Sequence, residues 1–198
     1  VMAVLHQNAR EASYELAAES GAFPAFGMSI LPDPLRNATV TTVAPTGSLH
    51  IIAGTSSGIE PLFSLAYERS IAGETFSFFH PVLADILSNR TDGDWLTALV
   101  RRSGSVQDLP LPADLVEVFR TATEIPAEEH LAMQAAVQRH VDNAVSKTVN
   151  LPFSATREDI SRVFLAARER GAKGITVFRD RCREGQVIMR GCPACEIE

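Results

Sequence analysis

The chain has 198 residues, of which 45% are hydrophobic and 21% charged, and its formal net charge is −6. This composition is typical of a globular protein with one sizeable core, and it excludes an intrinsically disordered chain. The acidic balance argues against a nucleic-acid partner bound through a basic surface, although a local turn of amide donors can still bind an anionic nucleotide.

The first part of the chain predicts a long helix followed by turns and short elements. Apolar residues recur at helical spacing until Gly21, and no apolar run approaches the roughly 20 residues that cross a bilayer, so we expect no membrane partner. A helical pattern already runs at Val1, without an initiator methionine, so we expect the chain to begin inside a longer polypeptide. The expected elements are a helix over 1–20, a loop over 21–34, a strand over 37–43, a short helical segment over 49–53 and a strand over 62–71.

The second part alternates helices with strands. Helices are predicted over 81–88, 94–102, 112–121, 127–141 and 156–170, and strands over 144–151 and 174–178. The helix over 156–170 has the clearest signals, because Thr156 can cap it, Asp159 lies at its third position and Gly171 ends it. Its expected buried stripe is Ile160, Val163, Phe164 and Ala167. A strand, a helix and a strand in that order favour a parallel crossover, so the predicted fold class is α/β.

A turn suited to an anion follows the first predicted strand. The residues concerned are Ala44, Pro45, Thr46, Gly47 and Ser48. Unpaired amides at a helix start, beside Thr and Ser hydroxyls, form a ready anion site, and Gly47 would let the backbone approach a phosphate closely. From the pattern alone, an ordinary capped helix start without a ligand is the more common case. The turn is not a Walker A loop, because no lysine follows in the required place.

A second turn-rich segment covers residues 54–61, where two glycines enclose three hydroxyl residues and Glu60 precedes a proline. This pattern predicts a tight loop that could line a pocket, with Glu60 as a hydrogen-bond acceptor for a substrate or cofactor. A glutamate bonded within its own loop is the plainer alternative.

The cysteines all lie after position 180, so they form no disulfide framework, and a reducing cytoplasm is the expected compartment. Cys192 and Cys195 form a CxxC pair, which can exchange thiols for a disulfide or supply half of a zinc site. Both interpretations stay open at this point. The five histidines show no ligand spacing, so no metal site is predicted.

Three segments, 36–63, 138–152 and 173–180, carry a resemblance in order and spacing. They include Ala-Pro-Thr-Gly-Ser from Ala44, Ser-Ser-Gly-Ile-Glu-Pro from Ser56 and Ser-Lys-Thr-Val-Asn-Leu-Pro from Ser146. In these segments the chain resembles class II (adenosylcobalamin-dependent) ribonucleotide reductases. The resemblance implies that the chain is the C-terminal part of a ten-stranded α/β barrel. It also implies an enzyme that converts ribonucleoside diphosphates to 2′-deoxyribonucleotides by thiyl-radical chemistry, with adenosylcobalamin as its cofactor.

The same resemblance implies roles for individual residues. Residues 44–48 bind the substrate phosphates, and residues 182–198 are a flexible tail after a barrel part over 1–181. The segment that borders the active site and the cofactor comprises Ser56, Ser57, Gly58, Ile59 and Glu60. Cys192 and Cys195 are the tail dithiol that re-reduces the active site, and a thioredoxin-like reductant is the implied partner.

The sequence departs from the family pattern in ways that affect activity. The finger-loop sequence Asn-Pro-Cys-Gly-Glu is absent, no cysteine precedes Cys182, and His50 stands where the family usually has a small or hydroxyl residue. We therefore expect the chain alone to be inactive and to act with the remainder of the reductase. The alternatives are a small subunit of a split reductase, or a nucleotide-binding module without catalytic activity.

Overall fold

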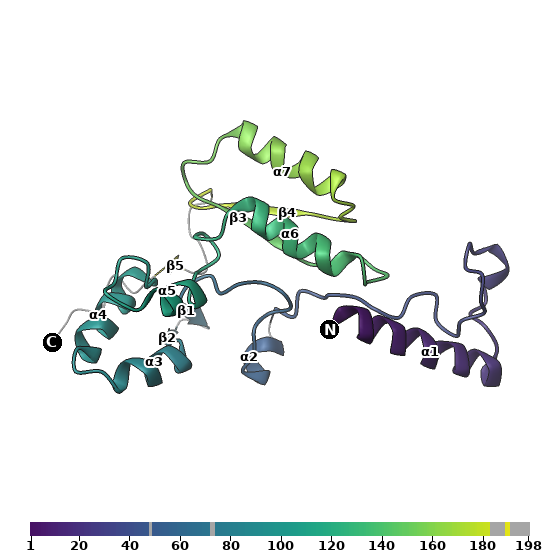
Figure 1. Cartoon of the computed structure of the whole chain (residues 1–198), viewed down its shortest axis with the longest axis horizontal. Coiled ribbons are helices and arrows are strands. Elements are labelled where there is room, and N and C mark those ends of the chain that lie inside the picture. The colour runs from purple at the N-terminus through teal and green to yellow at the C-terminus, as the bar shows by residue number, and fades with distance from the viewer. Residues whose placement is uncertain (48, 72–73, 183–188, 191–198) are drawn as a thin grey trace. The chain divides into compact units, whose positions relative to one another are not determined.

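The computed structural model describes residues 1–47, 49–71, 74–182 and 189–190 (Figure 1). By its internal contacts the chain divides into two compact units. Unit 1 consists of Val1–Ile59, Ala127–Val149 and Thr156–Val177, and unit 2 consists of the rest of the chain. The described residues mix helices and strands, as expected for the α/β class. Within them the strands form a three-stranded and a two-stranded sheet, so no barrel is closed.

Unit 1 is mainly helical. Its elements are α1 (Met2–Ser20), the 3-10 helix η1 (Phe26–Met28), α2 (Leu49–Ala53), α6 (Ala127–Gln138), α7 (Arg157–Glu169) and the first halves of β3 (Thr148–Leu151) and β4 (Thr176–Arg179). Helix α1 ends where predicted, because Gly21 adopts a φ of 80° and its amide donates to the carbonyl of Ala17. Strands β3 and β4 are neighbours in the two-stranded sheet, which confirms that the two strands flanking α7 pair.

The structure confirms most of the predictions made for helix α7. Thr156 and Asp159 form a reciprocal capping box, in which each side chain accepts from the backbone amide of the other residue. Val163 and Ala167 are buried as predicted. Phe164 is not, since 49% of it is exposed. The buried stripe is therefore narrower than the apolar pattern suggested.

The strand predicted over 37–43 is reduced to one parallel bridge between Val43 and Val145. The backbone before the bridge finds side-chain partners instead of a strand ladder, because the amide of Val40 donates to Asp142. The strand predicted over 144–151 is also shorter. It begins at Thr148, and before it Val145 makes only the isolated bridge to Val43. Val145 joins Val137 and Val141 in a buried cluster, against which Val43 and Ile59 pack.

Unit 2 is built around a hairpin and three helices. Its elements are β1 (Ala66–Ile71), β2 (Glu74–Phe79), α3 (Pro81–Ser88), α4 (Gly93–Ser103), α5 (Ala113–Val118) and β5 (Met189–Arg190), with the sheet order β2-β1-β5. Strands β1 and β2 pair in antiparallel register from Ala66 opposite Phe79 to Ile71 opposite Glu74. The prediction found β1 but missed β2.

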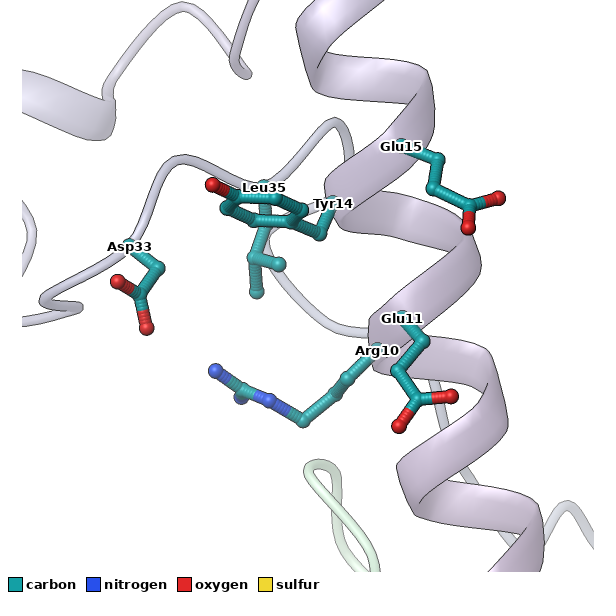
Figure 2. A pocket seen from close by; sticks show the side chains of 6 residues that line it. All are labelled: Arg10, Glu11, Tyr14, Glu15, Asp33 and Leu35. Carbon is teal, nitrogen blue, oxygen red and sulfur yellow. The ribbon is translucent and has the colours of Figure 1, made fainter.

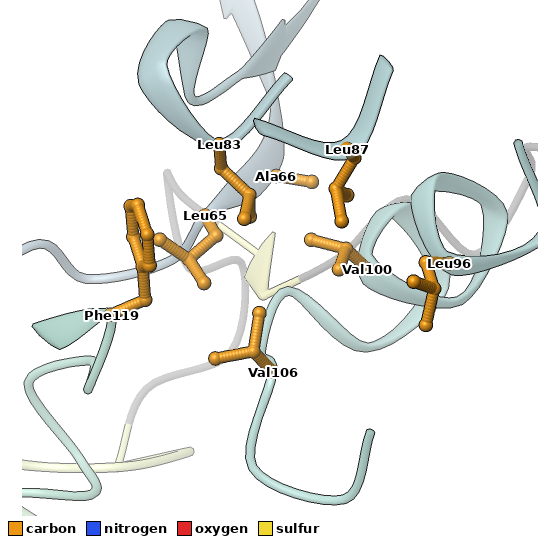
Figure 3. Packing of buried hydrophobic residues seen from close by; sticks show 8 residues of the cluster. All are labelled: Leu65, Ala66, Leu83, Leu87, Leu96, Val100, Val106 and Phe119. Carbon is orange, nitrogen blue, oxygen red and sulfur yellow. The ribbon is translucent and has the colours of Figure 1, made fainter. Parts of the chain in front are cut away.

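An apolar cluster fills the interior of unit 2 (Figure 3). Its buried members are Leu65, Ala66, Leu83, Leu87, Leu96, Val100, Val106 and Phe119. The first residue of α4, Gly93, lies very close to the end of α3. A Cβ on Gly93 would lie 2.0 Å from the carbonyl oxygen of Leu87. Only glycine fits there without a shift of the backbone.

Candidate phosphate-binding site

The turn at 44–48 begins from a firmly held segment. Asn143 donates its amide to the carbonyl of Thr41 at 3.1 Å, and Ser146 donates its amide to the carbonyl of Val43 at 2.9 Å. Together with the Val43–Val145 bridge, these bonds attach the segment before the turn to the loop over 141–146. The turn therefore starts from a fixed position within unit 1.

The turn itself is open to solvent at its glycine. Thr46 has a positive φ of 45°, an uncommon conformation for a residue with a side chain. Gly47 is exposed, and no heavy atom lies within 4 Å of the position that a Cβ would occupy. The short helix α2 follows from Leu49. The described backbone thus leaves room for a ligand to approach Gly47 closely.

His50 makes two contacts with the carbonyl oxygen of Thr46. Its amide donates to the carbonyl of Thr46 at 3.4 Å, and its ring Nδ1 lies 2.9 Å from the same oxygen. A carbonyl oxygen can only accept, so the ring must carry its proton on Nδ1. The histidine that departs from the family pattern therefore makes a direct bond to the turn.

The two turn-rich segments predicted from the sequence meet here. Ser57 donates its hydroxyl to the carbonyl of Pro45 at 2.6 Å, and its Oγ lies 3.3 Å from Oγ1 of Thr46. A hydroxyl has one proton, so Thr46 must be the donor in the second contact. In this arrangement the proton of Thr46 is engaged within the protein, and backbone amides are the donors left for an anion.

Gly58 makes the meeting of the two segments possible. It adopts a φ of 57°, and a Cβ there would lie 3.3 Å from the carbonyl oxygen of Ala44. A side chain would therefore meet both backbone strain and a tight contact. The remaining predicted residues are placed differently: Ser56 is exposed, Ile59 packs on the Val137 cluster and Glu60 is half-buried in unit 2.

Some predicted residues lie outside the described part of the chain. These are Ser48, Cys192 and Cys195. Cys182, the cysteine that is described, is exposed and free. Over the described ranges, no group of three or more His, Cys, Asp or Glu side chains could hold a metal ion. No helix in the described part of the chain is long and apolar enough to span a bilayer.

A pocket on α1 does not suit a phosphate group. Figure 2 shows its lining residues, which are Arg10, Glu11, Tyr14, Glu15, Asp33 and Leu35. Three carboxylates and one guanidinium line it, so the local charge is negative. An anionic ligand would be repelled there, whereas the neutral amides near Gly47 would attract it.

Comparison with known proteins decides the family. A profile described as "Ribonucleotide reductase, barrel domain" matches residues 28–178. The chain belongs to this ribonucleotide reductase family. The match confirms the family-level resemblance found in the segments from Ala44, Ser56 and Ser146.

Individual relatives narrow the resemblance to the class II reductases. The vitamin B12-dependent ribonucleoside-diphosphate reductase of Mycobacterium tuberculosis (strain ATCC 25618 / H37Rv) is 47% identical over 197 residues, which cover 98% of this chain and 28% of the relative. A protein of the same name from Thermoplasma acidophilum is 38% identical, covering 96% of this chain and 26% of the relative. The vitamin B12-dependent ribonucleotide reductase of Streptomyces coelicolor is 32% identical, covering 77% and 17%. The chain thus spans between 17% and 28% of the length of these curated relatives.

Proposed function

We propose that this chain is part of a vitamin B12-dependent ribonucleoside-diphosphate reductase and supplies the turn that binds the substrate's phosphates. The observation that carries the proposal is the exposed Gly47, in a turn held by Ser57 on one side and by His50 behind. Backbone amides in such a turn can bind the oxygens of a diphosphate without a basic side chain. The open space at the Gly47 Cβ position allows the close approach that these bonds need.

The chemistry of the whole enzyme is proposed on the basis of the relatives. Their names describe vitamin B12-dependent reductases, so we propose adenosylcobalamin as the cofactor and a ribonucleotide as the substrate. The cofactor would supply the radical chemistry when bound. In residues 56–60, Ser57 and Gly58 contact the turn and Ile59 contacts the Val137 cluster. In the complete reductase, residues 56–60 would border the cofactor and the active site.

The tail dithiol remains a proposal. Cys192 and Cys195 would pass electrons from a thioredoxin-like reductant to an oxidised active site by thiol–disulfide exchange. The sequence has no cysteine before Cys182, so the radical cysteine would come from the remainder of the reductase. We expect this chain alone, given adenosylcobalamin and a dithiol, to form no deoxyribonucleotide. Turnover by the isolated chain would contradict this expectation.

The phosphate-binding proposal is tested in the full-length reductase that carries this segment. We expect Gly47→Ala to raise the KM for a ribonucleoside diphosphate about tenfold, because the new methyl group keeps the phosphate from the backbone. Gly27→Ala is the matched control, since Gly27 is also exposed, with nothing within 4 Å of its Cβ position. Equal KM values in the two variants would refute the proposed role of the turn.

A further inference from the structure

The carboxylate of Asp142 contacts the start of the segment over 40–43, which leads into the turn. Its Oδ2 accepts a hydrogen bond from the amide of Val40 at 2.7 Å. The amide of Asp142 donates in turn to Oγ1 of Thr41 at 3.0 Å. Two successive residues are thus bonded to one aspartate that lies 102 positions away from Val40 in the sequence. A carboxylate that accepts from a backbone amide forms a charge-assisted bond, stronger than a bond between neutral groups.

Helix α1 contributes to the same contact. Nδ1 of His6 lies 3.1 Å from Oγ1 of Thr41 and 3.9 Å from Oδ1 of Asp142. The side chain of Asp142 is 19% exposed and that of His6 is 25% exposed, so water screens these interactions only in part. The hydroxyl of Thr41 therefore meets partners from both α1 and the loop over 141–146.

The loop that carries Asp142 is anchored independently of the turn. Gln138, at the end of α6 and 7% exposed, donates through Nε2 to the carbonyl of Val141 at 3.2 Å and to that of Asn143 at 2.9 Å. The side chain of Lys173 donates to the carbonyl of Asp142 itself. Because the side chains of Gln138 and Lys173 bond the backbone at Asp142 and on both sides of it, the carboxylate sets the position of Val40 rather than following it.

We propose that Asp142 is a positioning residue for the substrate's phosphates. Its carboxylate fixes Val40, at the start of the segment that leads into the turn, while Ser57 fixes Pro45 within the turn itself. The amides of Thr46 and Gly47 then keep their direction when a phosphate arrives, so that little ordering is needed on binding. This inference rests on the proposed role of the turn.

The test compares variants of Asp142 in the full-length reductase. We expect Asp142→Ala to raise the KM for a ribonucleoside diphosphate, and the inhibition constant of inorganic pyrophosphate, about tenfold while kcat stays within about twofold. Asp142→Asn keeps an oxygen acceptor for the amide of Val40 and should restore KM to within about threefold of the wild-type value. Asp33→Ala, an equal loss of charge at an exposed position of unit 1, should leave both constants unchanged.

A purely structural role predicts a different pattern. Fewer correctly folded molecules would lower kcat and leave KM alone, and this result would overturn the inference. If Asp142→Ala does not yield folded enzyme, Thr41→Val removes the hydroxyl in this contact with little change of shape, and an unchanged KM there would overturn the inference equally.

The Gly47→Ala variant separates this inference from the function on which it rests. A raised KM in Gly47→Ala with an unchanged KM in Asp142→Ala would overturn the positioning role and leave the phosphate turn intact. An unchanged KM in Gly47→Ala would overturn the proposed function. If both substitutions act through one turn, the double variant should raise KM by less than the product of the two single effects.

Discussion

The interiors of the two units are stabilised by different kinds of interaction. Unit 2 has a continuous apolar core, with Leu83, Leu87 and Leu96 fully buried, and the polar side chains that it buries are short, such as those of Ser64 and Thr121. Unit 1 buries long polar side chains. These are His130, Gln134, Gln138 and Lys147, each at most 7% exposed.

The long polar side chains of unit 1 hold loops in place. Lys147 donates to Nδ1 of His130 at 2.8 Å, and Gln134 donates to the carbonyls of Val145 at 3.3 Å and Gly174 at 2.7 Å. Hydrogen bonds are directional, whereas apolar contacts are not. In unit 1, which carries the turn, directional hydrogen bonds from buried side chains fix the loops. Unit 2 is stabilised mainly by apolar packing.

The largest expected effect concerns the core of unit 2. Leu83→Ala removes a fully buried side chain and should lower the free energy of local unfolding of α3 and α4 by about 3 kcal/mol, since it leaves a cavity. Hydrogen exchange of residues 81–103 in the full-length protein measures this change. The neighbouring Val82→Ala, at a position 57% exposed, should cost far less. Similar losses in the two variants would mean that the apolar cluster does not stabilise unit 2.

The corresponding change in unit 1 removes hydrogen bonds and keeps volume. Gln134→Leu leaves the carbonyls of Val145 and Gly174 without this buried donor, so we expect the opening of α6 to cost about 2 kcal/mol less. Hydrogen exchange of residues 127–138 measures it. Gln7→Leu, the same substitution at an exposed site on α1, is the control. A neutral effect at Gln134 would remove the distinction between the units.

A smaller effect is expected where the two turn-rich segments meet. Gly58→Ala and Gly54→Ala both place alanine at a positive φ, a strain of about 1 kcal/mol, but only Gly58 has a neighbour, the carbonyl of Ala44 at 3.3 Å. We expect the KM for a ribonucleoside diphosphate to rise about fivefold in Gly58→Ala and less than about twofold in Gly54→Ala. Equal KM values would show that the contact with Ala44 does not position the turn.

The smallest effect is a pH dependence of α7. Hydrogen bonds from Thr156, and then from Arg162, lower the pKa of Asp159 from 3.8 to about 2. A lowered pKa means that this contribution to stability is complete above pH 3.8 and is lost as the pH falls toward 2. Hydrogen exchange of residues 157–169 at several pH values should show the loss. Asp159→Asn should abolish the pH dependence, and its persistence in that variant would contradict the assignment.

Local signals explain what the sequence could predict. Gly21 and the Thr156–Asp159 pair lie next to the helix ends that they determine, so α1 and α7 were predicted within one or two residues. Strand β2 was missed, since four of its six residues are exposed and none is buried, so no alternation between a buried and an exposed face marks it. The strand over 37–43 was overpredicted because β-branched residues favour a strand but do not show which groups will pair with it.

Local signals also account for the parts of the candidate site that the sequence singled out. The pattern around Gly47 identified the turn, and the pattern around Gly58 identified the second segment, but neither showed that Ser57 bonds to Pro45. The proposed role of Asp142 could not be predicted from the sequence, because its bond to Val40 joins positions 102 apart and leaves no local pattern. Contacts of this kind appear only once the chain is folded.

The ring of His50 has a consequence for the charge near the turn. Both Nδ1 of the ring and the amide of His50 lie within hydrogen-bonding distance of the carbonyl oxygen of Thr46, so protein donors occupy both lone pairs of that oxygen. The negative end of this carbonyl dipole is therefore compensated inside the protein. An anion that approaches Gly47 would meet less repulsion than a bare carbonyl would exert.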